Sequence, residues 1–454
     1  MNPLSTCKNI YFIGIGGIGM SALARYFNTQ GVFVSGYDKT PTELTHALEA
    51  EGIKIHFEDD LNKIDKEATV IVYTPAIPAN HGELNFYKDN GYLVVKRSDV
   101  LQWITENAFT IAIAGTHGKT TTTSMTAHIL RHTGYGCNAF LGGIASNYGT
   151  NFLSHEKNVV VVEADEYDRS FLKLAPNIAV ITAVDPDHLD IYGTAEEVVK
   201  AFGEFSDKIK AGGTLIQKKG THFTTNTANK NVLTYAYDQL AASFHTINLK
   251  VVDGSYHFDL VHPKGVLKNI VLNMGGLHNV ENATAAIAIA LSLDIEKVKI
   301  IQAVAAFAGV KRRFEYKVKT PTKVLIDDYA HHPEELNALI TGIRSIFPGE
   351  KMVLVFQPHL YSRTKDQCDG FVSTLDKADE VILLPIYPAR ELPMEGVTSE
   401  MLLSKMSLSN KKVMSKEQLF DWAAHTKDKL VVMAGAGDID VCITKVQEIF
   451  TQQA

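Results

Sequence analysis

The sequence predicts an α/β fold in three domains with mostly parallel sheets, and two observations lead to this prediction. Twice, at residues 9–30 and 109–134, a short apolar run is followed by a glycine turn and a helical pattern. After residue 321 apolar runs and helical patterns alternate again, at the spacing that parallel strands joined by helices require. We expect domains at residues 1–107, 108–316 and 317–454.

The composition excludes several classes of protein. A chain of 454 residues is too long for one hydrophobic core, and 45% hydrophobic with 21% charged residues is ordinary for a globular protein. A net charge of −7 and a pI of about 6.2 argue against nucleic acid or an anionic membrane as the main partner. The four cysteines form no C-x-x-C pair, and no apolar run approaches the roughly 18 residues of a membrane helix. We therefore expect a cytoplasmic protein without structural zinc or stable membrane association.

The first glycine turn follows an apolar strand at residues 9–15. It contains Gly14, Gly16, Gly17 and Gly19, and the next strand, at 32–37, ends at Asp38. This G-x-G-x-x-G pattern is typical of a Rossmann-like domain, which places a diphosphate on the helix N-terminus and the carboxylate on a ribose or base. The pattern indicates a diphosphate without saying which nucleotide carries it. A tight turn that binds no ligand is the alternative.

The second glycine turn has the features of a phosphate loop. The strand at 109–114 leads into a turn whose backbone N–H groups and side chains can surround phosphates, formed by Gly115, Thr116, His117, Gly118, Lys119, Thr120 and Thr121. Lys119 would neutralise the β- and γ-phosphates, and the Thr120 hydroxyl can ligate Mg²⁺. The usual pattern has a further glycine where this chain has Ile113. A chance glycine turn before a helix is the alternative.

Two later strands end in groups suited to a metal ion. The strand at 158–164 ends in carboxylates that include Glu163, and the strand at 178–183 is followed by His188 among aspartates. In phosphate-loop enzymes a neighbouring strand end holds the metal, and a histidine among carboxylates can ligate metal or orient water. We therefore expect Thr120, Glu163 and His188 around Mg²⁺. A solvated acidic strand end and an ordinary surface histidine are the alternatives.

Polar residues also precede the helices of the second half of the chain. His278 and Asn279 precede an apolar helix, where Asn279 can also be no more than an N-cap. Arg313 follows two basic residues and can face a phosphate, although such clusters are usually solvated. In the third domain His331, His359 and Arg363 follow strands, where ligands of open α/β sheets bind. Arg363 can hold an α-carboxylate with two parallel hydrogen bonds, or can begin a helix and face water.

The ordered set of these motifs resembles the Mur ligases over essentially the whole chain. The quoted stretches are Gly14–Gly19, Gly115–Thr120, Glu163–Glu166, Asp187-His188, His278-Asn279, Lys311–Phe314, Asp327–Pro333 and Phe356–His359. The resemblance implies a UDP-sugar-binding domain, a central ATP-binding domain and a Rossmann-like amino-acid-binding domain. It also implies the use of ATP and Mg²⁺ and a role in peptidoglycan precursor synthesis in the cytoplasm.

The resemblance also implies roles for single residues. Lys119 and Thr120 fall on the family's phosphate loop, Glu163 and His188 on its metal ligands, and His278 and Asn279 near adenine. Arg313 falls near the γ-phosphate. The residues that fall on the family's amino-acid-binding site are Tyr329, His331, His359 and Arg363. The residues expected to take part in catalysis are Lys119, His188, Arg313 and His331.

Within the family the sequence is most similar to the branch that adds L-alanine to the lactyl carboxylate of UDP-N-acetylmuramate. That reaction proceeds through an acyl phosphate and gives ADP and phosphate. The alternative is the branch that attaches a recycled tripeptide to the same sugar. A protein that binds NAD, suggested by residues 14–38 alone, leaves the ATP-binding half unexplained.

Two positions depart from the family pattern. Several Mur ligases carry a carbamylated lysine where this chain has Gly203, and Lys200 is out of register, so we predict no carbamate. Leu360 stands where the alanine-adding branch often has arginine, and the sequence does not say whether it forms an apolar wall or marks a lost contact.

Overall fold

The structure is a computed structural model that describes residues 3–185, 189–389 and 391–453. It contains three α/β sheets, of five, ten and six strands, which follow one another along the chain. Strands pair in parallel through most of each sheet, as the sequence predicts. Within the described residues, no helix is both long and apolar enough to cross a membrane.

The first sheet has the strand order β3-β2-β1-β4-β5, and all of its pairs are parallel. Its central strand β1 is apolar and completely buried from Ile10 to Ile13, as expected for a parallel strand covered on both faces. The strands are β1 (Asn9–Ile13), β2 (Phe33–Tyr37), β3 (Lys54–His56), β4 (Val70–Tyr73) and β5 (Val94–Lys96). The helices are the short 3₁₀ helix η1 (Pro3–Thr6), α1 (Ile18–Thr29), α2 (Glu43–Ala50), α3 (Gly82–Asp89) and α4 (Arg97–Glu106).

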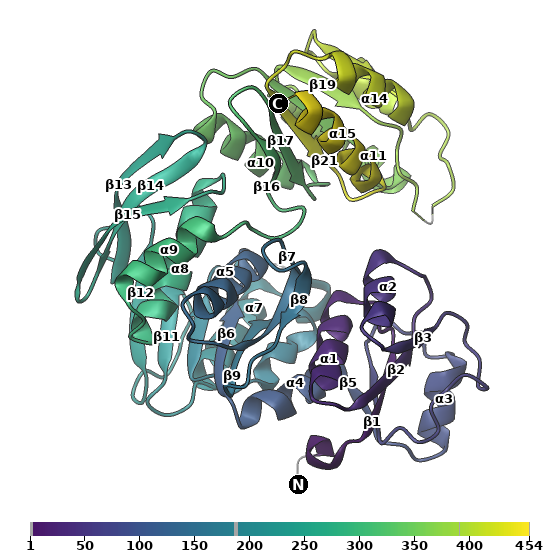
Figure 1. Ribbon diagram of the computed structural model, residues 1–454, viewed down its shortest axis with the longest axis vertical. Coiled ribbons are helices and arrows are strands. Elements are labelled where there is room, and N and C mark those ends of the chain that lie inside the picture. The colour runs from purple at the N-terminus through teal and green to yellow at the C-terminus, as the bar shows by residue number, and fades with distance from the viewer. Residues whose placement is uncertain (1–2, 186–188, 390, 454) are drawn as a thin grey trace. The chain divides into compact units, whose positions relative to one another are not determined.

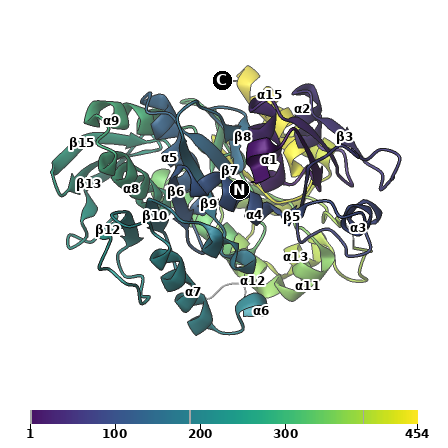
Figure 2. The ribbon, with the colours of Figure 1, turned by 90° about the horizontal axis from the view of Figure 1, so that it is seen from below.

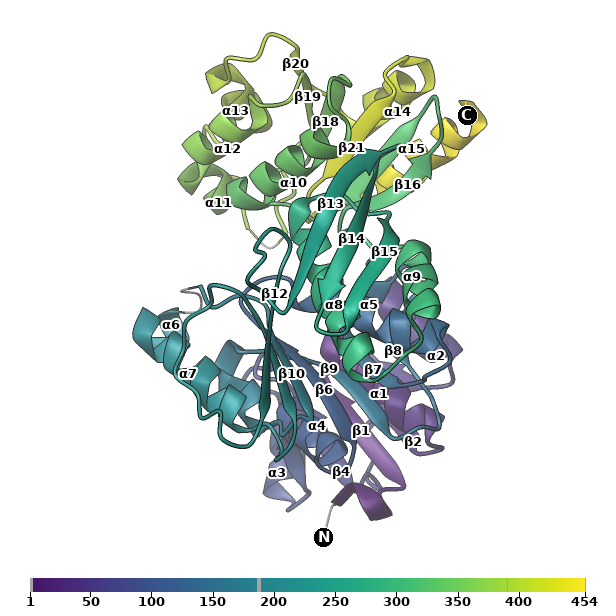
Figure 3. The same ribbon diagram turned by 90° about the vertical axis from the view of Figure 1, so that its left-hand side faces the viewer.

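The second sheet has the order β15-β14-β13-β12-β11-β10-β6-β9-β7-β8. Its strands are β6 (Phe109–Ala114), β7 (Asn138–Ala145), β8 (Thr150–Leu153), β9 (Val159–Ala164), β10 (Ile178–Ile181), β11 (Thr214–Lys218), β12 (Asn231–Ala236), β13 (Phe244–Val252), β14 (Ser255–His262) and β15 (Gly265–Leu272). Figure 3 shows the long strands β13, β14 and β15 side by side. The sequence analysis did not identify β7, β8 or β15.

Helices cover both faces of this sheet. They are α5 (Lys119–His132), the 3₁₀ helix η2 (Tyr167–Lys173), α6 (Leu189–Tyr192), α7 (Ala195–Asp207), α8 (Leu277–Ser292) and α9 (Lys297–Ala306). Figure 2 shows α5 and α7 on opposite sides of β6 and β10. Phe202 and Phe205 of α7 belong to the same apolar cluster as Ala112 and Ala114 of β6, and this cluster continues into the first sheet.

The third sheet has the order β16-β17-β21-β18-β19-β20, with only the edge strand β16 antiparallel to its neighbour. Its strands are β16 (Glu315–Lys319), β17 (Val324–Asp328), β18 (Met352–Phe356), β19 (Glu380–Leu383), β20 (Lys411–Val413) and β21 (Leu430–Ala434). Its helices are α10 (Pro333–Ile346), α11 (Tyr361–Asp366), α12 (Cys368–Leu375), α13 (Ser399–Lys405), α14 (Lys416–His425) and α15 (Ile439–Gln453). Proline at the first position of α10 and a capping box between His332 and Glu335 explain why this helix begins at Pro333.

The chain divides into two compact units, and the expected limits of three domains stay a prediction. The first unit comprises Met1–Asn248, Phe258–Ile270 and Glu281–Phe307, and the second comprises Leu249–His257, Val271–Val280 and Ala308–Ala454. The boundary therefore passes through β13, β14, β15 and α8. The first sheet and most of the second lie in the first unit, and helix α1 packs against both (Figure 1).

Candidate active site

The phosphate loop joins β6 to α5 and has the conformation that its glycines permit. Gly115 and Gly118 have φ of +134° and +80°, a region that side chains disfavour. A Cβ at Gly115 would collide with the Thr182 hydroxyl, which donates hydrogen bonds to the carbonyls of Ala114 and His117. The predicted helix is confirmed and begins two residues earlier than expected, at Lys119, so the N–H groups of its first turn are available at the loop.

Lys119 extends back over the loop and meets a carboxylate that the sequence analysis did not single out. Its Nζ donates hydrogen bonds to the Gly115 carbonyl at 2.6 Å and to both oxygens of Glu166 at 2.7 and 2.8 Å. Glu166 is buried, with 1% of its side chain exposed, and the Lys119 side chain is 17% exposed. The cation expected at the phosphates therefore has an anionic partner in this structure.

Thr120 and Glu163 place two oxygen ligands side by side at the start of α5. The Thr120 hydroxyl lies 3.3 Å from Glu163 Oε2, and the Gly142 N–H donates to Glu163 Oε1 at 2.8 Å. A Cβ at Gly142 would collide with this carboxylate, so the glycine of β7 makes room for it. A hydroxyl beside a carboxylate suits a hard cation such as Mg²⁺. No group of three or more His, Cys, Asp or Glu side chains with the arrangement of a metal site occurs among the described residues.

The structure describes some of the other residues expected around the phosphates. Thr116 donates from its hydroxyl to Asp185 at 3.3 Å, and His117 Nε2 lies 3.8 Å from the same carboxylate. His188, expected as a metal ligand, lies outside the described residues. Asn282 of α8 lies against Gly118, and the Thr122 hydroxyl lies 3.2 Å from its Oδ1, so α8 contacts the phosphate loop through Asn282.

The glycine turn of the first sheet is held by Asp38. Its Oδ2 accepts a hydrogen bond from the Gly16 N–H at 2.7 Å, and its Oδ1 accepts one from the Thr40 N–H at 3.2 Å. Gly14, at φ +87°, begins the turn. Asp38 therefore stabilises the turn in this structure, and its contact with a ribose or base stays a prediction, as do the ligand contacts of Gly14, Gly16, Gly17 and Gly19.

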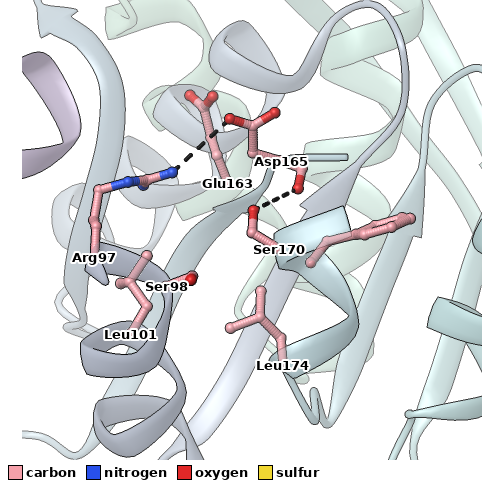
Figure 4. Close-up of a pocket in the computed structure, with 8 residues that line it drawn as sticks. Arg97, Ser98, Leu101, Glu163, Asp165, Ser170 and Leu174 are labelled. Carbon is pink, nitrogen blue, oxygen red and sulfur yellow. Dashed lines mark hydrogen bonds and ion pairs between the residues drawn. The ribbon is translucent and has the colours of Figure 1, made fainter. Parts of the chain in front are cut away.

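Arg97, the first residue of α4, lies between the two ligand turns. A Cβ added at Gly19 would lie 2.9 Å from its Nη1, so the guanidinium covers the start of α1. Its Nη2 points toward Asp165 and lies 3.9 Å from Oδ2 (Figure 4). Arg97 also lines a small pocket with Glu163. A cation is therefore placed between the expected diphosphate and the expected metal.

Asn151 of β8 fixes the first and second sheets relative to each other. It is completely buried, and its amide group donates to the Ile18 carbonyl at 2.6 Å and to the Ser21 hydroxyl at 2.8 Å. Its carbonyl oxygen accepts from Arg25, which also pairs with Glu51 at 2.7 Å. Since each buried polar atom of Asn151 has a partner, the start of α1 is held firmly against β8.

The residues expected near adenine and the γ-phosphate belong to the second unit. Asn279 is buried and donates from Nδ2 to the Gly275 carbonyl at 2.6 Å, whereas His278 is exposed. Arg313 is exposed, and its neighbour Arg312 turns inward, donating to the Gly435 carbonyl at 2.5 Å. The roles of His278, Asn279 and Arg313 toward ATP stay predictions.

Asp328 shapes the segment that carries Arg313. Its side chain accepts hydrogen bonds from the N–H groups of Phe314 and Ala330, both at 2.8 Å. Burial raises the pKa of Asp328 to about 6 and the pKa of Asp327, beside Arg312, to about 7. Asp327 is buried and Asp328 is half-buried at the base of this segment.

The residues expected on the amino-acid side come together at the carboxyl end of the third sheet. Tyr329 and His331 follow β17, with ring centroids 5.1 Å apart, and His359 follows β18, with its ring 6.0 Å from that of His331. Arg363 of α11 lies 3.5 Å from His359 Nδ1. Burial, together with Arg363 and His331, lowers the pKa of His359. The structure thus brings together all four predicted residues, and their binding of an amino acid stays a prediction.

Gly203 explains why no lysine occupies that position in this chain. A Cβ at Gly203 would collide with the Thr224 carbonyl oxygen, so the helix α7 packs there against backbone. Lys200 is exposed and lies 3.3 Å from Glu197 on the same helix.

Three residues of this region escaped the sequence analysis, and each had a weak signal. Glu166 ends the same acidic stretch as Glu163, and spacing alone cannot say which carboxylate meets Lys119. Arg97 follows a strand of the first sheet, the position where such sheets bind ligands, but a basic residue at a helix start is usually solvated. Tyr387, which stacks on His359, lies in a segment that carried no motif.

Comparison with protein families gives three matches along the chain. Residues 9–108 match the Mur ligase family catalytic domain, residues 113–290 match the Mur ligase middle domain, and residues 312–437 match the Mur ligase glutamate ligase domain. Together these matches cover most of the sequence and follow its three sheets.

Full-length relatives and solved structures extend the comparison. The chain is 46% identical to UDP-N-acetylmuramate--L-alanine ligase of Christiangramia forsetii, with all of both chains covered. It is 47% identical to the protein of that name from Cytophaga hutchinsonii, with 99% of this chain and 98% of the relative covered. The crystal structure of UDP-N-acetylmuramate-alanine ligase from Thermotoga maritima superposes with a TM-score of 0.82 at 27% identity, covering 98% of this chain and all of that one.

Proposed function

The chain belongs to the Mur ligase family, and from that premise we propose that it joins L-alanine to the lactyl carboxylate of UDP-N-acetylmuramate at the expense of ATP. Full-length identity of 46% and 47% to two relatives named for this reaction supports the proposal. The structural observation that carries it is the position of Arg97. This cation contacts the turn expected to bind the UDP-sugar and lines a pocket with Glu163 beside the phosphate loop, so one acid substrate can span both.

The reaction needs activation because a carboxylate is a poor electrophile. A lactyl carboxylate oxygen attacks the γ-phosphorus of ATP, ADP leaves, and an acyl phosphate forms. The alanine amine, after losing a proton, attacks the acyl carbon, and phosphate leaves with the oxygen that the carboxylate contributed. The protein must therefore hold two anions close together while charge moves between them.

Lys119 and the N-terminus of α5 supply most of the positive charge on the phosphate side. Lys119 Nζ lies over the loop, 2.6 Å from the Gly115 carbonyl and bonded to Glu166. We propose that it exchanges Glu166 for phosphate oxygens when ATP binds. We propose that Arg313 of the second unit approaches the γ-phosphate and that His278 and Asn279 contact adenine.

Magnesium would be held by the hydroxyl of Thr120 and the carboxylate of Glu163, with His188 as a further proposed ligand. Both oxygens face the phosphate loop, in the arrangement that hard cations prefer. When bound, the ion neutralises negative charge on the transferred phosphoryl group. Gly142 keeps Glu163 in place by donating its N–H to Oε1.

The amino acid would bind at Tyr329, His331, His359 and Arg363. The Arg363 guanidinium can hold the α-carboxylate with two parallel hydrogen bonds, and the aromatic rings around it limit the space for a side chain. Glycine would lose one methyl contact relative to alanine, about 1 kcal/mol, and larger side chains would be excluded by their size. A domain that closes over this site would protect the acyl phosphate from water.

We place the protein in the cytoplasm, where ATP and nucleotide sugars are available. Its four cysteines are free thiols, as expected in a reducing compartment. The alternative activity, attachment of a recycled tripeptide, has less support, because a murein peptide ligase of Psychrobacter arcticus is 21% identical to the chain with a TM-score of 0.64, which indicates a shared fold alone.

Phosphate release distinguishes the two activities. The purified full-length chain is incubated with ATP, Mg²⁺ and UDP-N-acetylmuramate, and each amino acid or the free tripeptide is added in turn. We expect fast release with L-alanine, slow release with glycine and serine, and none with the tripeptide. Faster release with the tripeptide than with alanine would assign the chain to the other branch.

A further inference from the structure

The segment after β19 is bonded directly to the segment that carries His359. His359 and Tyr387 form an isolated parallel bridge, in which the Leu360 N–H donates to the Tyr387 carbonyl and the Tyr387 N–H donates to the Pro358 carbonyl, both at 2.9 Å. The Tyr387 ring also stacks on the His359 imidazole, with centroids 5.7 Å apart and planes inclined by 21°. The Tyr387 backbone is therefore bonded to the two residues that flank His359, and its ring contacts the imidazole.

Leu360 shows that this segment is held in an unfavourable conformation. It has φ 69° and ψ 136°, a combination that is unfavourable for a residue with a Cβ. Its N–H bonds to Tyr387, and its carbonyl accepts from the Thr364 hydroxyl at 2.7 Å and the Thr364 N–H at 3.1 Å. The strained residue lies between His359 and Arg363. Such strain persists only where the surroundings determine the geometry, and it concentrates at functional sites.

Glu391, on the same segment as Tyr387, holds the helix that carries Arg363. Its carboxylate accepts a hydrogen bond from the Ser362 N–H at 2.9 Å and a second from the Ser362 hydroxyl. These hydrogen bonds lower the pKa of Glu391, so it is ionised at neutral pH. Ser362 immediately precedes Arg363, whose Nη1 lies 3.5 Å from His359 Nδ1. One segment thus constrains both groups from two directions.

We propose that Tyr387 and Glu391 are positioning residues of the amino-acid site. Tyr387 fixes the plane of the His359 ring, and Glu391 fixes the start of α11 and with it the direction of Arg363. Gly437 leaves the space that Tyr387 needs, because a Cβ there would lie 2.7 Å from the Tyr387 Cγ. This inference rests on the proposed function only for the identity of the substrate, since the contacts themselves are independent of it.

The kinetics of four variants of the full-length chain test the proposal. Tyr387→Ala removes the ring but keeps the backbone bridge, and Tyr387→Phe keeps the stacking surface. Tyr387→Ala should raise the KM for L-alanine about tenfold, because an imidazole that is no longer held in place weakens the binding of alanine; a tenfold change corresponds to roughly 1.4 kcal/mol of binding free energy. The KM for ATP should change less than twofold. Tyr387→Phe should restore the KM for alanine to within twofold of the parent. Glu391→Ala should raise the KM for alanine as Tyr387→Ala does. Glu391→Gln, which can still accept a hydrogen bond from Ser362, should give a KM between that of Glu391→Ala and that of the parent.

Titration of His359, followed by NMR, gives a readout that does not need the reaction. The groups that influence it are Arg363, His331 and Glu391, and burial contributes most to its low pKa. Tyr387→Ala should expose the imidazole and move its pKa up toward the ordinary value, whereas Tyr387→Phe should leave it unchanged.

The two measurements separate failure of this inference from failure of the proposed function. If the parent ligates alanine but Tyr387→Ala changes neither its KM nor the titration of His359, the positioning role is wrong. An equal rise in the KM values for alanine and ATP would also overturn the positioning role, because it would indicate that the substitution disturbs the fold as a whole. If the parent does not ligate alanine and the His359 titration still shifts as expected, the function is wrong and the positioning of His359 holds.

Discussion

Lys119 donates hydrogen bonds to both carboxylate oxygens of Glu166, at 2.7 and 2.8 Å, at the site where ATP is expected to place its phosphates. Glu166 is buried and Lys119 is largely covered, so each charge is stabilised by the other in place of part of its lost hydration. A triphosphate that enters the loop must take over Lys119, and Glu166 then faces additional negative charge. We therefore expect Glu166 to compete with the triphosphate for Lys119 and to weaken the binding of ATP.

Glu166→Gln should therefore tighten the binding of ATP in the absence of metal by about three- to tenfold, because roughly 1 kcal/mol of competing ion pairing is removed. Calorimetry with a chelator present measures this directly. Glu163→Gln is the matched control, since it removes a carboxylate of the same region that does not pair with Lys119. Equal tightening in both variants, or none in Glu166→Gln, would contradict the competition.

Lys119→Ala removes the cation of the same ion pair and should impair the reaction with ATP. Loss of a phosphate-neutralising charge should raise the barrier by roughly 3–5 kcal/mol, so ligation becomes barely measurable. Lys208→Ala, which removes an exposed lysine after α7, is the control and should retain the activity of the parent. Activity of Lys119→Ala within tenfold of the parent, with the fold intact, would exclude the assigned role.

Arg97 should contribute to the binding of the UDP-sugar and not to that of ATP. A charge-assisted hydrogen bond to an anion is worth roughly 1.5–3 kcal/mol, so Arg97→Ala should raise the KM for UDP-N-acetylmuramate about tenfold to a hundredfold. The KM for ATP should stay within twofold. Arg131→Ala, an exposed arginine of α5, is the control. The assignment fails if Arg97→Ala affects both substrates equally, or if the parent binds NAD tightly and does not respond to the UDP-sugar.

Lys200 should be dispensable, because the structure places it on the exposed side of α7 beside Glu197. Lys200→Ala should keep its activity within twofold of the parent, and added bicarbonate should not change the rate of either protein. A loss of more than tenfold, restored by bicarbonate, would reveal a carbamylated lysine and contradict our interpretation of Gly203.

His128 should make the stability of the first unit depend on pH. This buried histidine of α5 donates to the Ala303 carbonyl, with Nε2 at 2.9 Å, and accepts from the Tyr148 hydroxyl, also at 2.9 Å. Burial lowers its pKa from 6.5 to about 4. Between pH 6.5 and 4 the unfolded chain therefore binds a proton at His128 that the folded protein does not bind. As a result, the free energy of unfolding falls by roughly 3 kcal/mol as the pH is lowered from 6.5 toward 4.

The two tryptophans allow this loss to be measured in the first unit alone. Trp103 belongs to the first unit and Trp422 to the second, so in a Trp422→Phe background fluorescence reports only the unfolding of the first. In that background His128→Gln should flatten the dependence of the unfolding free energy on pH between 6.5 and 4. His132→Gln, on the exposed side of the same helix, should change the dependence only slightly, because His132 is the smallest of the influences on the pKa of His128. If the unfolding free energy depends on pH as strongly in His128→Gln as in the parent, groups other than His128 cause the dependence.

The parts of the fold that depend on local patterns were predictable. The run from Phe109 to Ala114, with glycines and Lys119 at fixed offsets, specifies strand, turn and helix within a few residues of chain. The gathering of His331, His359 and Arg363 was also predictable, because parallel strands bring their carboxyl ends to one edge. Strand β7 was missed because its apolar residues are interrupted by glycines such as Gly142, which makes room for Glu163, and β8 was missed because it is only four residues long.

Relationships between distant segments could not be predicted from one sequence. Nothing local says that Lys119 pairs with Glu166 rather than Glu163, or that Asp38 bonds the turn at Gly16. The compact units also divide the chain inside α8, a continuous apolar helix with no sequence signal at the boundary. These features depend on tertiary packing, which pattern and spacing do not determine.

Transfer of oxygen from the sugar acid to phosphate tests the central claim most directly. The full-length chain is incubated with ATP, Mg²⁺, L-alanine and UDP-N-acetylmuramate whose lactyl carboxylate carries ¹⁸O, and products are analysed by mass spectrometry. We predict a UDP-sugar heavier by one alanyl residue and one ¹⁸O atom in each phosphate released, because the carboxylate oxygen attacks phosphorus. Phosphate without ¹⁸O, or no alanylated sugar while ATP is consumed, would contradict the proposed ligation.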